Sequence, residues 1–165
     1  MIDLGRIERA VVEKEPFPRM TASRLLDDEV LWAIAQDFPA IASPGIFSLS
    51  DLSYGSVFAA LIDNIRGAGL EALVEEKFGI DLSGKPLMIT VRGHCRKKDG
   101  RIHTDSKDKL LTCLLYLNEP HWQADGGRLR FLRDEHDFNG TIAEVAPVGG
   151  NFAAFRRTDN SWHGH

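Results

Sequence analysis

The chain of 165 residues has few cysteines and no long apolar run. Its two cysteines, Cys95 and Cys113, have no metal-motif spacing, and no secretion signal precedes them, so we expect free thiols rather than a disulfide framework. No apolar run approaches the roughly 18–20 residues of a membrane helix. We therefore expect a cytoplasmic protein that makes no membrane contact.

The chain also lacks an excess of positive charge. Its net charge is −4 and its pI is near 5.8. A nucleic-acid-binding domain is usually basic, so we expect no nucleic-acid partner. Hydrophobic residues make up 43% and charged residues 27%, as in ordinary globular proteins. At this length we expect a single domain spanning residues 1–165.

The sequence pattern changes near residue 85. Before it, apolar residues recur at helical spacing, which predicts three helices, over residues 27–38, 56–66 and 70–78. After it, short apolar or alternating runs separated by turn residues predict strands over residues 86–92, 110–118, 128–133, 141–145 and 151–156.

These elements predict an α+β fold, in which a helical N-terminal layer (residues 1–84) packs on a β-barrel core (residues 85–165). The run over residues 110–118 is almost continuously apolar, which favours a strand buried on both faces. Cys113 is interpreted as a small core residue of that strand.

The most informative motif is His103-Thr104-Asp105. Residues i and i+2 of a strand point to the same face, so an imidazole and a carboxylate lie side by side. One more histidine from a distant strand would complete a two-His-one-carboxylate triad that leaves open positions on Fe(II). His163 and His165, at the end of the chain, share one strand face and are the candidates.

Four pieces of sequence together carry a family resemblance: residues 102–105, residues 111–118, residues 126–130 and the late histidine. In this combination the chain resembles the Fe(II)- and 2-oxoglutarate-dependent dioxygenases of the prolyl-hydroxylase type. The resemblance runs from about residue 86 to the C-terminus. It implies a double-stranded β-helix (jelly-roll) barrel supported by the N-terminal helices, with Fe(II) as cofactor and 2-oxoglutarate and O2 as cosubstrates.

The resemblance also assigns residues. His103 and Asp105 match the first two iron ligands, and His163 matches the distal one; we prefer it to His165 because a chain-terminal residue is a poorly held ligand. Tyr116 matches a tyrosine that contacts the 2-oxoglutarate carboxylate, and Leu129 an apolar residue that lines the cosubstrate.

The implied reaction is hydroxylation of a protein side chain or small molecule, with decarboxylation of 2-oxoglutarate to succinate. Halogenating members of the family carry a small residue where this chain retains Asp105, so a hydroxylase is expected. A non-catalytic, cupin-like metal-binding or sensing barrel remains an alternative, as does a structural barrel whose histidines are incidental. The sequence does not name the substrate.

The sequence departs from the family pattern at its end. Members carry an Arg or Lys about eight to ten residues beyond the distal histidine, which pairs with the remote carboxylate of 2-oxoglutarate. This chain ends two residues after His163. We therefore expect a barrel that lacks its last strand, and we favour a truncated sequence. Another base in the chain is the alternative, with Arg130 and Arg156 as candidates.

Overall fold

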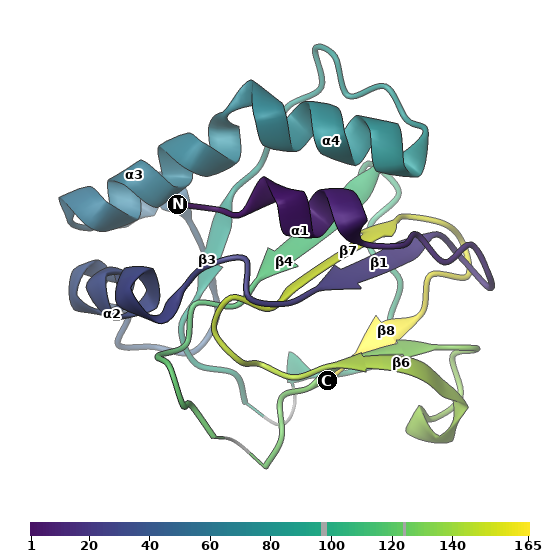
Figure 1. The fold of residues 1–165 in the computed structure, drawn as a ribbon. Helices are drawn as coiled ribbons and strands as arrows, with labels where there is room; N and C mark the ends of the chain where they lie inside the picture. The colour runs from purple at the N-terminus through teal and green to yellow at the C-terminus, as the bar shows by residue number, and fades with distance from the viewer. Residues whose placement is uncertain (97–98, 124) are drawn as a thin grey trace.

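The computed structural model describes residues 1–96, 99–123 and 125–165. Figure 1 shows helices above one antiparallel sheet, with a second sheet below it. The helices are α1 (Leu4–Arg9), α2 (Asp28–Asp37), α3 (Ser56–Arg66) and α4 (Ala68–Phe78), with short 3-10 turns η1 (Leu49–Asp51) and η3 (Phe138–Gly140). The strands are β1 (Arg19–Ala22), β2 (Ile46–Ser48), β3 (Thr90–Arg92), β4 (Leu111–Leu115), β5 (Leu129–Leu132), β6 (Thr141–Val145), β7 (Phe152–Arg156) and β8 (His163–Gly164).

The three predicted helices are confirmed as α2, α3 and α4. Asp27 caps α2 because its side chain accepts a hydrogen bond from the Val30 N–H at 2.9 Å. Gly79 ends α4 with a φ of +60°, a left-handed conformation that favours glycine. The sequence pattern did not indicate α1, which is only six residues long and buries one side chain, Ile7.

The strands form two three-stranded antiparallel sheets and one two-stranded sheet. The first has the order β1-β7-β4 and the second the order β6-β5-β8, while β2 pairs with β3. All pairings are antiparallel. The mixed helix-and-sheet class predicted from the sequence is therefore confirmed.

The two larger sheets face each other across an apolar core. It contains buried residues of β5, β6 and β7 together with one residue of the loop before β1: Phe17, Leu129, Phe131, Val145, Ala153 and Phe155. Alternate residues of β7, Phe152 and Ala154, point to the other face of the sheet and pack under α1 and α4. A third cluster joins α2 and α3 to Val91 of β3. The helices thus cover one face of the β1-β7-β4 sheet, and the second sheet covers the other.

Strand β4 is not buried on both faces, so that prediction is wrong. It is an edge strand of its sheet, and its residues are half-buried or exposed. Cys113 is exposed rather than a core residue. The surrounding protein is nevertheless dense enough for burial to raise the pKa of its thiol to about 12. The thiol of Cys113 therefore stays protonated at neutral pH.

The N-terminal half is not purely helical. Strand β1 pairs with β7 in the central sheet, and β2 pairs with β3, so the sheets include residues from before position 85. The predicted strand over residues 86–92 is shortened to β3. The described strands form three separate sheets rather than a closed barrel. In the described part of the chain, no helix has the length and apolar character needed to span a bilayer.

Candidate metal site

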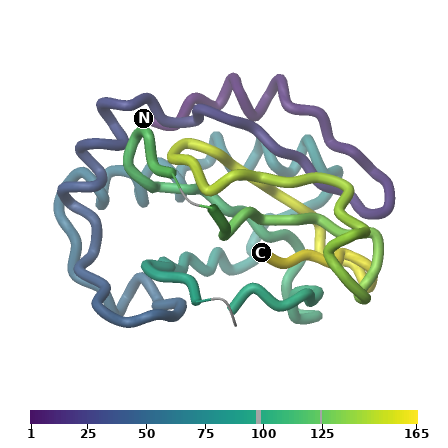
Figure 2. Tube along the Cα trace, turned by 90° about the horizontal axis from the view of Figure 1, so that it is seen from below, coloured from purple at the N-terminus to yellow at the C-terminus, as the bar shows by residue number. Residues whose placement is uncertain are grey.

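Two histidines that lie 60 residues apart in the chain (163 − 103) meet at the end of the second sheet. The His103 N–H donates to the His163 carbonyl at 2.9 Å, and the His163 N–H donates to the His103 carbonyl at 3.0 Å. On its other side, His163 pairs with Phe131 of β5. Figure 2, seen from below, shows the C-terminal end of the chain near the middle of the trace. Backbone pairing therefore fixes the relative position of the two rings.

Asp105 completes the group. Its Oδ1 lies 3.9 Å from His103 Nε2 and 3.9 Å from His163 Nε2. One ligand atom from each of the three residues lies within 4.8 Å of the others. The two imidazole rings are tilted against each other with their centroids 4.3 Å apart. Two nitrogens and one carboxylate oxygen thus converge on one point, which is a donor set suited to a divalent iron ion.

Both histidines are held in the tautomer that a metal requires. His103 Nδ1 lies 2.8 Å from the Arg101 carbonyl oxygen, and His163 Nδ1 lies 2.9 Å from the Ser161 carbonyl oxygen. A carbonyl can only accept, so each Nδ1 carries the proton and donates it. In the neutral imidazole each Nε2 then carries the lone pair, on the side that faces Asp105. In both cases the carbonyl belongs to the residue two positions earlier.

The neighbours of Asp105 keep its carboxylate ionised and orient it. Burial raises the pKa of Asp105. Three neighbours outweigh burial and lower this pKa: the Thr112 hydroxyl, which donates a hydrogen bond to Oδ2, the Lys109 ammonium 3.3 Å from Oδ1, and the charge of His163. Asp105 is therefore ionised at neutral pH. Because Thr112 occupies Oδ2, the other oxygen remains directed at the histidines.

His163 is the most enclosed member of the group. It is 6% exposed, and its ring packs on that of Phe155 with centroids 4.5 Å apart. Burial lowers its pKa, and the charge of His103 acts in the same direction, while the Ser161 carbonyl and Asp105 act against it. The net lowering keeps the imidazole neutral at pH 7, as a metal ligand must be. His103, in contrast, has a side chain that is 50% exposed, so the group is open on that side.

The sequence analysis missed Thr112 and Lys109 as parts of this site. Thr112 lies on the same face of β4 as Leu114, which contacts the core between the sheets. That alternation was a readable signal, but the sequence could not show that the face reaches Asp105. Lys109 lies four residues after Asp105 in a turn. The sequence around it contains no motif that predicts its contact with the Asp105 carboxylate.

Tyr116 and Leu129, which the resemblance assigns to the cosubstrate, lie in the same part of the structure. Both belong to the core between the sheets. Burial raises the pKa of Tyr116 to about 12; Cys95 adds to this, while the Leu129 backbone and the charge of Arg92 oppose it. The hydroxyl therefore stays protonated and can donate a hydrogen bond to an anion.

Three further sequence candidates lie elsewhere. His165 is outside the three-residue group, and its Nε2 is 3.4 Å from a guanidinium nitrogen of Arg92. Arg130 alternates with Leu129 and Phe131, so it points away from the space between the sheets, and it pairs with Glu144 at 2.8 Å. Arg156 shares a face with Ala154, on the helix side of β7. Neither Arg130 nor Arg156 faces the space between the sheets.

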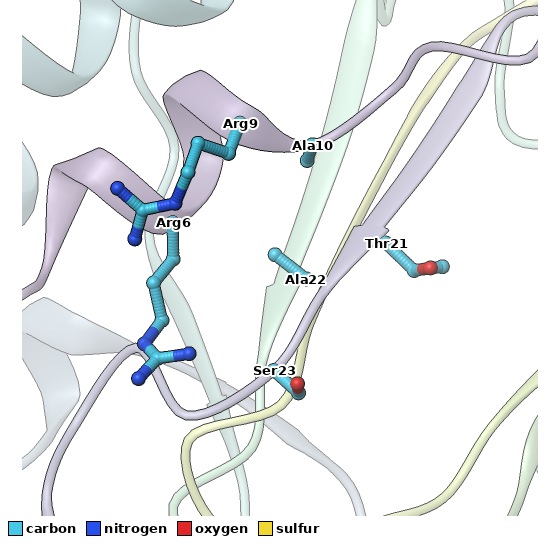
Figure 3. Close-up of a pocket in the computed structure, with 6 residues that line it drawn as sticks. All are labelled: Arg6, Arg9, Ala10, Thr21, Ala22 and Ser23. Atoms are coloured by element: carbon cyan, nitrogen blue, oxygen red, sulfur yellow. The ribbon is translucent and has the colours of Figure 1, made fainter.

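A shallow pocket of about 220 Å³ lies between α1 and β1 (Figure 3), away from the three-residue group. Arg6 and Arg9 of α1 line it beside Thr21 and Ala22 of β1. Arg6 is already paired with Asp3 at 3.3 Å. The pocket contains none of the predicted site residues.

Replacing Thr112 by valine is expected to weaken metal binding by about 10-fold, because groups that orient a ligand typically contribute 10–100-fold to affinity. Valine keeps the shape of the side chain but removes the hydrogen bond to Asp105. Titration calorimetry with Mn(II) measures the effect. Thr21→Val is the matched control, since Thr21 is exposed on β1. Equal affinities for the two variants would contradict the role of Thr112.

Comparison with protein families gives one match: residues 91–165 match the family model described as the 2OG-Fe(II) oxygenase superfamily. This superfamily uses Fe(II) and 2-oxoglutarate, so the matched segment supports an oxidoreductase. The resemblance and the cofactors predicted from the sequence are thereby confirmed at the superfamily level; the prolyl-hydroxylase type stays a prediction. Among curated proteins and among solved structures, nothing matches the chain.

Proposed function

We propose that the protein is an Fe(II)- and 2-oxoglutarate-dependent dioxygenase that hydroxylates a protein side chain or a small molecule, because residues 91–165 match the model of the 2OG-Fe(II) oxygenase superfamily. The observation that carries the proposal is the convergence of His103, Asp105 and His163, with both Nε2 atoms 3.9 Å from one carboxylate oxygen. These three residues hold the iron. When bound, Fe(II) supplies the oxidative chemistry that couples decarboxylation of 2-oxoglutarate to hydroxylation.

The chain's own residues prepare and shield this centre. The Arg101 and Ser161 carbonyls keep both imidazoles oriented, and Thr112 holds the carboxylate. Phe155 and the core behind it exclude water from the His163 side. The half-exposed side of His103 leaves a route for O2 and substrate.

The protein also offers groups for the cosubstrate. The Tyr116 hydroxyl stays protonated and can donate to a carboxylate, and Leu129 provides an apolar wall beside it. In this proposal the two facing sheets are the two halves of a jelly-roll barrel in one domain of residues 1–165. The facing core between the β1-β7-β4 and β6-β5-β8 sheets supports that description.

Succinate formation tests the proposal. The protein, supplied with Fe(II), 2-oxoglutarate and O2, is expected to release succinate, and omission of either Fe(II) or 2-oxoglutarate should reduce it to background. Since this assay contains no substrate to be hydroxylated, anaerobic binding of 2-oxoglutarate to the metal-loaded protein is measured in parallel.

The two measurements separate the alternatives. Metal binding with neither 2-oxoglutarate binding nor succinate would contradict the dioxygenase and favour a cupin-like metal-binding or sensing protein. Absence of metal binding would leave only a structural role for the three residues. A library of candidate peptides and small acids, scanned for stimulated succinate release, then identifies the substrate class.

A further inference from the structure

The pocket between α1 and β1 is lined by two cations and by no carboxylate. Arg6 and Arg9 both belong to the last turn of α1, and Figure 3 shows their side chains extending from the helix on the same side of β1. The pocket volume of about 220 Å³ is below the roughly 300–1,000 Å³ of sites for drug-sized ligands. The pocket therefore fits a small anionic group.

The guanidinium groups of both arginines keep N–H donors for such an anion. Asp3 Oδ2 lies 3.3 Å from Arg6 Nε, but this buried nitrogen makes no hydrogen bond. The Arg6 side chain is 41% exposed, so the rest of its guanidinium is open to a ligand. The Arg9 guanidinium forms no ion pair or hydrogen bond within the ranges that the structure describes.

A glycine lets the two cations gather around one carboxylate. A Cβ placed on Gly5 would lie 3.1 Å from Arg9 Nη1 and 3.2 Å from Asp3 Oδ1, both shorter than the 3.4–4 Å of ordinary contact. The Arg9 side chain therefore lies back along α1 over Gly5 and ends near Asp3. Because Asp3 also pairs with Arg6, one carboxylate stands against two guanidinium groups, and one positive charge is left over.

The strand side of the pocket presents the backbone of Thr21. The Arg156 N–H donates to the Pro18 carbonyl, and antiparallel pairing alternates, so the Thr21 N–H and C=O point away from β7 to the free edge of β1. Arg19, which has the same orientation, exchanges two hydrogen bonds with Glu13. No described backbone group pairs with Thr21 on this edge. Its side chain points away from the arginines in Figure 3, so the backbone lines the pocket.

This combination of groups favours phosphate over other small anions. The guanidinium groups and the Thr21 N–H donate, while the Thr21 carbonyl can only accept. A fully ionised anion such as sulfate has no proton for that carbonyl. A phosphate group that retains one proton can donate to the carbonyl and accept from the other groups, and its charged oxygens match the planar fork of an arginine.

We propose that Arg6, Arg9 and the Thr21 backbone form a binding site for a phosphate group, separate from the candidate metal site. The phosphate group belongs either to inorganic phosphate or to a small phosphomonoester. Both sources have the same chemistry at the two arginines, and titrations distinguish them. The site does not depend on the proposed dioxygenase function.

The experiment compares the full chain with Arg9→Gln, which removes the charge and keeps a long polar side chain. Arg66→Gln is the matched control, because Arg66 is also an exposed arginine in the last turn of a helix, α3, but does not line the pocket. The two variants lose the same favourable charge at a helix end. We expect equal thermal unfolding. All proteins are dialysed against a chelator, so that phosphate on a bound metal does not contribute.

Titration calorimetry with inorganic phosphate is run at about pH 6, near the second pKa of a phosphate group. Arg9→Gln is expected to weaken phosphate binding by about 10-fold, since hydrogen bonds between charged groups are the strong ones. Arg66→Gln should bind as the wild type does. Asp3→Asn should bind phosphate more tightly, because it removes the competing carboxylate; the Asp3 side chain makes no capping hydrogen bond that this change would break. Sulfate should bind the wild type more weakly than phosphate.

Glycerol 3-phosphate identifies the source of the phosphate group. Tighter binding than that of inorganic phosphate indicates a phosphomonoester, and equal or weaker binding indicates inorganic phosphate. The inference is overturned if the wild type binds neither probe, if Arg9→Gln binds phosphate as tightly as Arg66→Gln does, or if sulfate equals phosphate. None of these results bears on succinate formation, so the proposed dioxygenase function stands or falls separately.

Discussion

Replacing His103 by alanine is expected to lower the affinity of the protein for Fe(II) or Mn(II) by about 100-fold or more, since loss of a direct ligand costs more than the 10–100-fold that orienting groups contribute. His103 is the best of the three positions to change. Its side chain is 50% exposed, so the substitution creates no buried cavity. Metal content after dialysis and anaerobic titration calorimetry provide two independent readouts.

Asp105→Asn extends the same test with almost no change in shape. The amide retains one oxygen, but it loses the negative charge that balances a divalent cation, so metal affinity should fall by a similar factor. His136→Ala is the control for both variants, because His136 is exposed in the loop between β5 and β6. Unchanged metal content in both His103→Ala and Asp105→Asn would rule out the proposed ligand set.

The largest effect on stability is expected at Phe155, where alanine should lower the free energy of unfolding by about 3–5 kcal/mol. The side chain is fully buried in the centre of β7. Its ring contacts the Phe131 ring at 5.4 Å and the His163 ring at 4.5 Å between centroids. Removing it leaves a cavity between the two sheets and takes away the support of one candidate metal ligand.

Urea unfolding followed by tryptophan fluorescence measures this change. Val11→Ala is the control, because Val11 is 75% exposed and its substitution should alter stability by less than about 0.5 kcal/mol. The Phe155→Ala variant should also bind metal less tightly than the control. A loss of stability below about 1 kcal/mol would mean that the sheets close over the cavity and that the core is not packed as described.

Helix and strand positions were largely predictable, because they depend on local periodicity. The helical spacing of apolar residues located α2, α3 and α4. The predicted strand ends were less accurate, since the strand predicted over residues 110–118 is observed only as the shorter β4 (Leu111–Leu115). Its burial was wrong for a different reason: an apolar run does not reveal whether a strand lies at the centre or the edge of a sheet.

The sequence also predicted the residues of the candidate site. His103 and Asp105 were recognised from their i, i+2 spacing, and Tyr116 and Leu129 from the resemblance. The choice between His163 and His165 rested on weaker grounds, and their coordination of iron stays a proposal. The contact of Thr112 with Asp105 and that of Arg92 with His165 were not predictable, because each depends on how separate segments of the chain pack together.

By itself, the sequence determined the residue types of the candidate site and the faces on which neighbouring residues point, because these follow from the two-residue period of a strand. Only the tertiary structure decided that His103 pairs with His163, that both Nδ1 atoms meet backbone carbonyls, and that Arg92 lies beside His165. The first and the last of these contacts join residues far apart in the chain. They are set by strand order and register, which depend on how the whole apolar core packs rather than on any local run of residues.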